Sequence, residues 1–211
     1  MGKGKKTRAR RLQLKIDLDL SDYKAESWYT DSTKLIKELY GDYWTLFVDL
    51  LAATSPRSQV KKNWKIADAI LTAYKNREKR PEKFLDVLTS KAVLPAHLNN
   101  VIRALQRRPI KGPKVRRFAE NLKGNLSDVT IDVWICKAYG IDQKKLTPKL
   151  YARLEKRIQA DARRRDIMPA NWQAILWYAV RRLAGKREKS FVSVYRSIFC
   201  ETPCFAFMQE N

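Results

Sequence analysis

The stretch that decides the fold is "RRPIKGPKVRRFAENLKGNLSDVTIDVWICKAYG", residues 107–140. A Gly-Pro turn at 112–113 is followed at once by Lys114. Eighteen residues further on, Asp132 interrupts an apolar run. An amine placed after a tight turn and a lone carboxylate among apolar residues are both candidates for chemistry.

Turn and helix signals continue on both sides of this stretch. We expect helices at about 113–123, ended by Gly124, and at about 132–139, ended by Gly140, because Gly commonly follows the last helical residue. Asp31 or Ser32 is expected to cap an earlier helix. Apolar residues recur at helical spacing through most of the chain, and Pro suits the first turn of several segments, at positions 81, 95, 148 and 169. The expected class is all-α, with about ten helices.

The composition points to a polyanionic partner. The 211 residues carry 44 Lys and Arg against 22 Asp and Glu, a formal net charge of +22, and 45% of them are hydrophobic. Such a charge opposes compaction unless a polyanion neutralises it, so nucleic acid is the leading expected partner class and an anionic membrane surface is the rival. No apolar run reaches the roughly 18 to 20 residues of a membrane span, and no signal peptide is visible. We therefore expect the cytoplasm or nucleoid, or the host cytoplasm for a phage-encoded protein; the oligomeric state stays open.

The cysteines and the lone histidine exclude several kinds of site. Cys136, Cys200 and Cys204 form no CxxC or Cys/His pattern, and an iron–sulfur cluster requires four cysteine ligands. His97 is the only His, which argues against Ser/His or Cys/His catalysis. We expect no metal and no cofactor.

The chain divides into a short lead-in and one helical domain. Residues 1–20 are interpreted as a basic arm, with six basic side chains in the first eleven residues, followed by an extended lead-in at 12–20. Residues 21–211 are expected to form the helical domain. Within it we place a helical hairpin at about 95–123, the Asp132 segment at 129–140 and C-terminal helices at 147–200.

Basic residues are concentrated around the Gly-Pro turn. Eight of them fall between 103 and 123, against the single acid Glu120. A turn that leads into a helix N-terminus offers free N–H groups to a phosphate, and neighbouring cations add to this attraction. The alternative is a solvated charged face.

Three motifs resemble one enzyme family. "RPIKGPK" (108–114) is similar to the hairpin of the helix–hairpin–helix (HhH-GPD, endonuclease III-like) DNA glycosylase superfamily, and "VTIDVW" (129–134) to its Asp segment, in the same register. "LFVDLLAATSPRSQVKKNWKIADAIL" (46–71) looks like its opening helix pair. The similarity covers about residues 43–140 and indicates a divergent member of phage or plasmid type without the iron–sulfur cluster.

The resemblance implies roles for individual residues. Asp132 would stabilise the charge that develops on the sugar, and Lys114 would form a Schiff base with it. The polar residue that fills the gap left by a flipped base would be Thr54, with Gln59 as a substitute. The partner that the resemblance implies is double-stranded DNA, and the residues expected to contact it are Arg108, Lys111, Gly112, Arg116 and Arg117.

The chain also departs from the family pattern, and alternatives stay open. Ile110 replaces the first hairpin Gly, where it makes a positive φ costly. Asp132 could only cap a helix, and Lys114 could only contact phosphate. The indoles at 134, 172 and 177 are expected in the core rather than stacked on bases.

The function expected from the resemblance is base excision repair by a DNA N-glycosylase, with or without AP-lyase strand nicking. Two alternatives remain: a DNA base-modifying enzyme of the same fold, and a non-catalytic DNA-binding protein that keeps the hairpin. Ile110 and Val133, which stand where the family has Gly and a small polar residue, favour the last.

Overall fold

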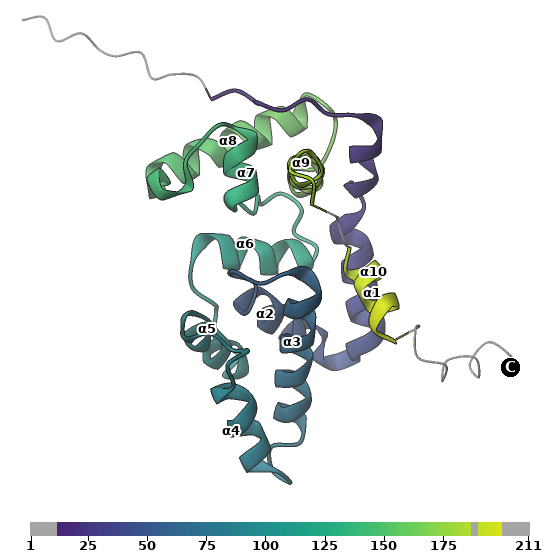
Figure 1. Ribbon diagram of the computed structural model, residues 1–211, viewed down its shortest axis with the longest axis vertical. Helices are drawn as coiled ribbons and strands as arrows, with labels where there is room; N and C mark the ends of the chain where they lie inside the picture. Colours follow the sequence, from purple (N-terminus) through teal and green to yellow (C-terminus); the bar gives the residue numbers. More distant parts are fainter. Residues whose placement is uncertain (1–11, 187–189, 200–211) are drawn as a thin grey trace, which may run out of the picture.

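The computed structural model describes residues 12–186 and 190–199, and this part of the chain is all-α, as expected (Figure 1). The expected basic arm at 1–11 and the residues after 199 lie outside the described part. The α-helices are α1 (Trp28–Tyr40), α2 (Trp44–Ala53), α3 (Val60–Lys75), α4 (Pro81–Thr89), α5 (Pro95–Leu105), α6 (Pro113–Leu122), α7 (Val133–Ala138), α8 (Pro148–Arg163), α9 (Pro169–Leu183) and α10 (Phe191–Phe199). The 3-10 helices are η1 (Leu20–Ala25), η2 (Gly41–Tyr43) and η3 (Gln143–Lys145).

Most helices begin where the local chemistry predicts. Proline occupies the first position of α4, α5, α6, α8 and α9, where its missing N–H removes no helical hydrogen bond. The expected cap of the first helix is wrong, because α1 begins at Trp28 and Ser32 lies inside it, with its hydroxyl on the Trp28 carbonyl. Burial of Trp28 and Tyr29 extends the helix beyond the local polar signal.

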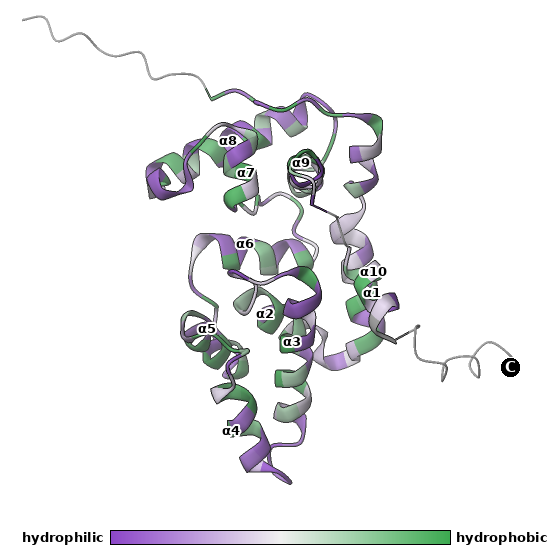
Figure 2. Ribbon diagram, in the orientation of Figure 1, coloured by the Kyte–Doolittle hydropathy of each residue, from purple (hydrophilic) through white to green (hydrophobic). Residues whose placement is uncertain are grey.

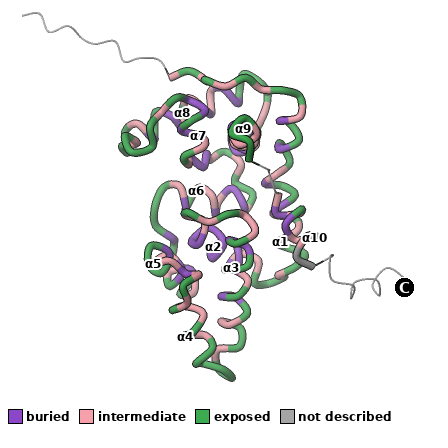
Figure 3. Tube along the Cα trace, viewed as in Figure 1, coloured by how far each residue is buried: buried purple, intermediate pink, exposed green. Residues whose placement is uncertain are grey.

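The larger hydrophobic cluster is built from α1, α2, α3, α5, α6 and α10. Its largest fully buried side chains include Phe47, Trp64 and Phe191. α2 is its centre, with every residue from Leu46 to Ala53 except Asp49 buried, and Figure 3 shows buried segments gathered there. The residues of α4 are exposed or half-buried and form the far end of the molecule (Figure 3).

The smaller hydrophobic cluster joins α7, α8 and α9. The extended lead-in lies across it, since the apolar side chains at 12, 14, 16 and 18 pack against the cluster while the alternate positions face solvent. The Lys15 N–H donates to the Ala138 carbonyl at 2.7 Å, which fixes the lead-in to the end of α7. Figure 2 shows the alternation of hydropathy along this segment.

Helix α9 connects the two clusters. Ala170 and Ala174 pack in the larger one, whereas Trp172 and Ile175 pack in the smaller one. The buried Asp22 of η1 accepts two hydrogen bonds from the Arg182 guanidinium, at 2.8 and 2.9 Å, and ties the N-terminal segment to α9. Among the described residues, no helix is long and apolar enough to cross a membrane.

Candidate active site

Two side chains of α5 hold the hairpin between α5 and α6. Arg103 Nε donates to the Pro109 carbonyl at 2.6 Å. Asn100 accepts from the Lys111 N–H at 2.7 Å and donates to the Lys111 carbonyl at 2.9 Å. Ile110 is buried in the larger cluster and so anchors the turn. The positive φ values that the turn requires fall at Arg107 (57°) and Gly112 (100°), so Ile110 causes no backbone strain.

Lys114 stands in the first turn of α6, immediately after Gly112 and Pro113. Its side chain is half-buried, and Nζ donates to the Ser55 hydroxyl at 3.4 Å. Burial lowers the pKa of Lys114, and the neighbouring Asp132 carboxylate opposes this shift. A larger fraction of this amine is therefore neutral than of a solvated lysine at the same pH.

Asp132 caps α7 and also faces the site. Oδ1 accepts from the backbone N–H groups of Trp134 (2.9 Å) and Ile135 (3.0 Å), and Oδ2 accepts from Trp177 Nε1 at 3.1 Å. Burial raises the pKa of Asp132, while these hydrogen bonds and Lys114 act in the opposite direction. The predicted helix cap by Asp132 is confirmed. It uses Oδ1, so Oδ2, which accepts one hydrogen bond from Trp177, keeps a second lone pair.

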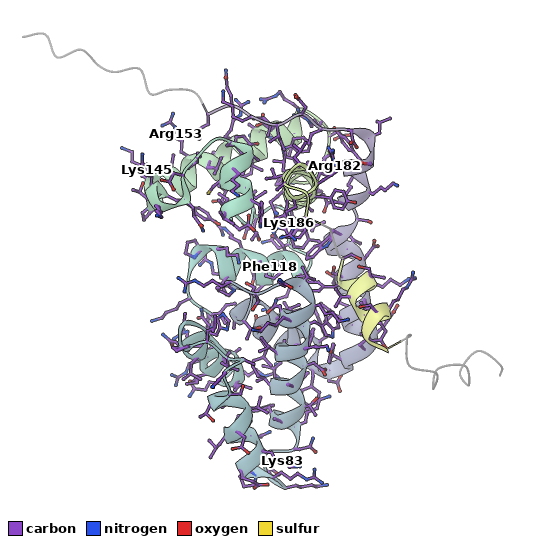
Figure 4. All side chains as sticks on the ribbon, viewed as in Figure 1. Lys83, Phe118, Lys145, Arg153, Arg182 and Lys186 are labelled. Carbon is purple, nitrogen blue, oxygen red and sulfur yellow. The ribbon has the colours of Figure 1, made fainter. Side chains whose placement is uncertain are left out.

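Lys114 and Asp132 line the same cavity, of about 520 Å³. Its walls come from the start of α1, residues 55–60, the first half of α6, residues 130–134 and one face of α9. Both hydrophobic clusters contribute, so the cavity lies where they meet. Phe118, a lining residue that belongs to α6, is labelled in Figure 4 and shows where the cavity lies along the molecule.

The aromatic lining was not expected from the sequence. Trp134 and Trp177 are half-buried: they pack against the smaller hydrophobic cluster, as predicted, and they also line the cavity, while Trp172 is fully buried. Arg181 lies over both cavity indoles, 5.1 Å from the Trp134 ring centre and 4.7 Å from that of Trp177. Trp28 completes an electron-rich wall.

It was not predicted from the sequence that one face of α9 lines the cavity. Gln173, Trp177 and Arg181 recur every four residues and all line the cavity. Gln173 is only 4% exposed, and its Oε1 accepts from the Tyr29 hydroxyl at 2.8 Å. A polar residue aligned with an Arg on an otherwise apolar helix was the signal that could have indicated this face.

Two residues expected to contact DNA are engaged inside the protein. Thr54 is fully buried and donates to Asn63 Oδ1 at 2.7 Å, so it cannot enter a DNA duplex. Arg117 forms ion pairs with Asp128 (3.0 Å) and Glu155 (2.9 Å), which fasten α6 to the start of the second cluster. Burial contradicts the predicted insertion of Thr54 into a duplex, whereas ion pairs occupy Arg117, whose contact with DNA stays a prediction.

The remaining residues expected to contact DNA are accessible. Arg108, Lys111, Gly112 and Arg116 are exposed on the hairpin and the first turns of α6. Gln59 is exposed, lines the cavity and occupies the N-cap position of α3 without a capping hydrogen bond from its side chain. Gln59 is therefore the better placed of the two residues expected to fill the gap in the duplex.

The comparisons with known proteins give a family but no described relative. No curated protein and no solved structure matches the chain. One family model matches residues 20–184, which include every element from η1 to α9. The chain therefore belongs to the family of unknown function DUF7178.

Proposed function

We propose that the protein is a DNA N-glycosylase that acts on a base turned out of duplex DNA, with an AP-lyase step at Lys114. The observation that carries the proposal is that Lys114 and Asp132, brought from the starts of α6 and α7, line one cavity beside an exposed basic hairpin. Cleavage of an N-glycosidic bond needs both a stabilising carboxylate and a site for a flipped base.

Asp132 supplies the negative charge. As the bond between C1′ and the base breaks, positive charge develops on the sugar, and a carboxylate fixed nearby lowers the energy of that state. The two backbone N–H groups on Oδ1 and the Trp177 indole on Oδ2 hold this carboxylate in place before the substrate arrives. No reorganisation is then needed during the reaction.

Lys114 supplies the nucleophile. Its neutral amine forms a bond to C1′ as the base leaves with the electron pair of the glycosidic bond and takes up a proton. The attached amine loses a proton to Asp132 or to water, and its lone pair then forms the C=N bond as the C1′–O4′ bond breaks; O4′ takes up a proton, and the product is a protonated imine. Burial lowers the pKa of Lys114, which favours the neutral, nucleophilic amine.

The DNA-binding surface is the hairpin with the first turns of α6. Lys111, Arg108 and Arg116 surround the N-terminus of a ten-residue helix and can neutralise phosphates of duplex DNA. The clamp from Asn100 makes the hairpin rigid. The order α5, hairpin, α6 and then the Asp segment supports an HhH-GPD-type arrangement of the all-α fold, a divergent one without an iron–sulfur cluster.

The test is borohydride trapping combined with strand cleavage. Duplexes carrying damaged, mismatched, abasic or modified bases are incubated with wild type, Lys114→Ala and Asp132→Asn. Borohydride reduces an imine to a stable amine, so we expect a trapped adduct with wild type on at least one substrate. It should be absent with Lys114→Ala and at least about 100-fold slower to form with Asp132→Asn.

Other outcomes decide between the alternatives. Base loss without an adduct would leave Asp132 as the catalytic group and remove the lyase step. A changed base that stays attached to its sugar would indicate DNA base modification. Tight binding without any product would indicate a non-catalytic DNA-binding protein, and a trapped adduct that survives Lys114→Ala would contradict the assigned nucleophile.

A further inference from the structure

We infer that Gln173 selects the base, and that it accepts bases which present a carbonyl oxygen, as uracil, thymine and hypoxanthine do, over the corresponding amino bases. The inference rests on the proposed function, because it concerns the edge of a base held in the cavity. It is carried by one polar side chain that is buried, fixed in orientation and open to the cavity on one side.

The orientation of the Gln173 amide is set by Tyr29. The Tyr29 hydroxyl donates to Oε1 at 2.8 Å, and Tyr29 is itself 2% exposed. Burial raises the pKa of Tyr29 to about 12, so the hydroxyl keeps its proton and remains a donor at physiological pH. If the amide turned over, Nε2 would donate to the Tyr29 oxygen, and the Tyr29 O–H would lose the acceptor that Oε1 provides, which is unfavourable in a buried site.

The other end of the amide is unused. Within the described part of the chain, Nε2 of Gln173 makes no hydrogen bond, yet it is not sealed from solvent, and the residue lines the cavity. Because Oε1 is engaged by Tyr29, the Nε2 N–H groups are the part of this lining residue that is left for a ligand. The indole N–H of Trp28, another lining residue, is buried and likewise has no acceptor among the described residues. This side of the cavity therefore carries two hydrogen-bond donors, Gln173 Nε2 and Trp28 Nε1, that have no acceptor among the described residues.

The position along α9 suits the far edge of a base. Gln173 lies one helical turn, about 5.4 Å, before Trp177, which contacts Asp132. A sugar whose C1′ lies beside Asp132 would direct its base along α9, so that an exocyclic atom reaches Nε2. A carbonyl oxygen there accepts a hydrogen bond, whereas an exocyclic amine opposes one donor to another.

The experiment measures binding, so that it does not depend on turnover. Duplexes carry uracil or cytosine, or hypoxanthine or adenine, opposite a tetrahydrofuran abasic site, which leaves neither member of a pair base-paired. In an Asp132→Asn background we expect the carbonyl base of each pair to bind roughly 5- to 150-fold more tightly, the range for a buried donor that gains or loses its acceptor. Adding Gln173→Leu should abolish the preference.

Two further variants separate recognition from folding. Tyr29→Phe should reduce the preference because the amide is then free to turn over, and Gln143→Leu, the same exchange at an exposed residue of the cavity wall, should retain it. Melting curves establish that each variant is folded. Equal binding of both members of each pair, or a preference that survives Gln173→Leu, would overturn the inference and leave the glycosylase proposal standing. Failure to bind any duplex would overturn both.

Discussion

At the scale of single residues, burial changes the ionisation of the two candidate groups of the site, the Asp132 carboxyl and the Lys114 amine. Burial raises the pKa of Asp132 and lowers that of Lys114, so both shifts favour the neutral forms. The hydrogen bonds to Asp132 and the attraction between the two groups offset part of this cost. A carboxylate near a lysine whose pKa is lowered is the combination that the proposed nucleophilic attack on a sugar requires.

Trp177→Phe tests the indole hydrogen bond to Asp132. Phe keeps an aromatic ring beneath Arg181 but removes the N–H that stabilises the ionised carboxylate, so the pKa of Asp132 should rise further. We expect a ¹³C NMR titration of the Asp132 carboxyl, and the acid limb of the pH–rate profile, to move to higher pH. Trp134→Phe is the matched control, because Trp134 donates to Asp132 only through its backbone.

The sign of the stability effect follows from the direction of the shift. A carboxyl whose folded-state pKa is raised contributes stability below its unfolded pKa, and this contribution is lost as pH rises through the folded-state pKa. Trp177→Phe should therefore lose more thermal stability relative to Trp134→Phe at neutral pH than near pH 4. An unchanged titration of Asp132 in Trp177→Phe would contradict the assigned hydrogen bond.

At the scale of elements, the starts of α6 and α7 determine where Lys114 and Asp132 lie. α6 begins where Gly112 takes a φ of 100°, and this turn sets the direction of Lys114. α7 begins at its Asp132 cap, which fixes the carboxylate by the same hydrogen bonds that start the helix. Both functional groups therefore belong to first turns, where backbone geometry is most constrained by local sequence.

Gly112→Ala tests the hairpin geometry. A Cβ at this position would meet no heavy atom within 4 Å, so the cost is backbone strain alone, about 1–3 kcal/mol of unfolding free energy. Gly124→Ala at the other end of α6, where φ is 101°, should cost a similar amount. Only Gly112→Ala should also lower DNA affinity and adduct formation. Equal functional loss in both variants, measured at matched folded fractions, would show that the hairpin has no special role.

At the scale of the whole molecule, the excess positive charge is divided between surfaces with different expected roles. The hairpin carries exposed cations beside the cavity, whereas α4 carries the exposed Lys83 at the far end of the molecule (Figure 4), and the exposed Lys79 lies in the turn just before α4. Long-range attraction draws on all of these charges, but release of counterions on binding counts only those at phosphates.

The salt dependence of DNA binding separates these surfaces. The double variant Lys111→Gln/Arg116→Gln removes two cations that are proposed to neutralise phosphates. The magnitude of the slope of log K against log salt should fall by about 0.9 for each of them, so by about 2 altogether. Lys79→Gln/Lys83→Gln changes the net charge equally and should leave the slope unchanged. The reverse result would place the DNA-binding surface at α4.

The sequence by itself determined the helical class, most helix starts and the two functional groups. Helical periodicity, proline at first positions and capping by Asp132 are local effects, and local effects can be read from neighbouring residues. That Lys114 and Asp132 act together was predicted from their spacing, which matches that of the family that the motifs resemble. In the structure both residues line one cavity.

Only the tertiary structure decided which side chains remain free. Thr54 and Arg117 are occupied by Asn63 and by carboxylates on other segments, and Gln173 meets Tyr29 across 144 residues of chain. Burial and long-range hydrogen bonds depend on how helices pack, which periodicity does not specify. For the same reason the aromatic and polar walls of the cavity, on which the proposed selection of the base rests, could not be read from the sequence.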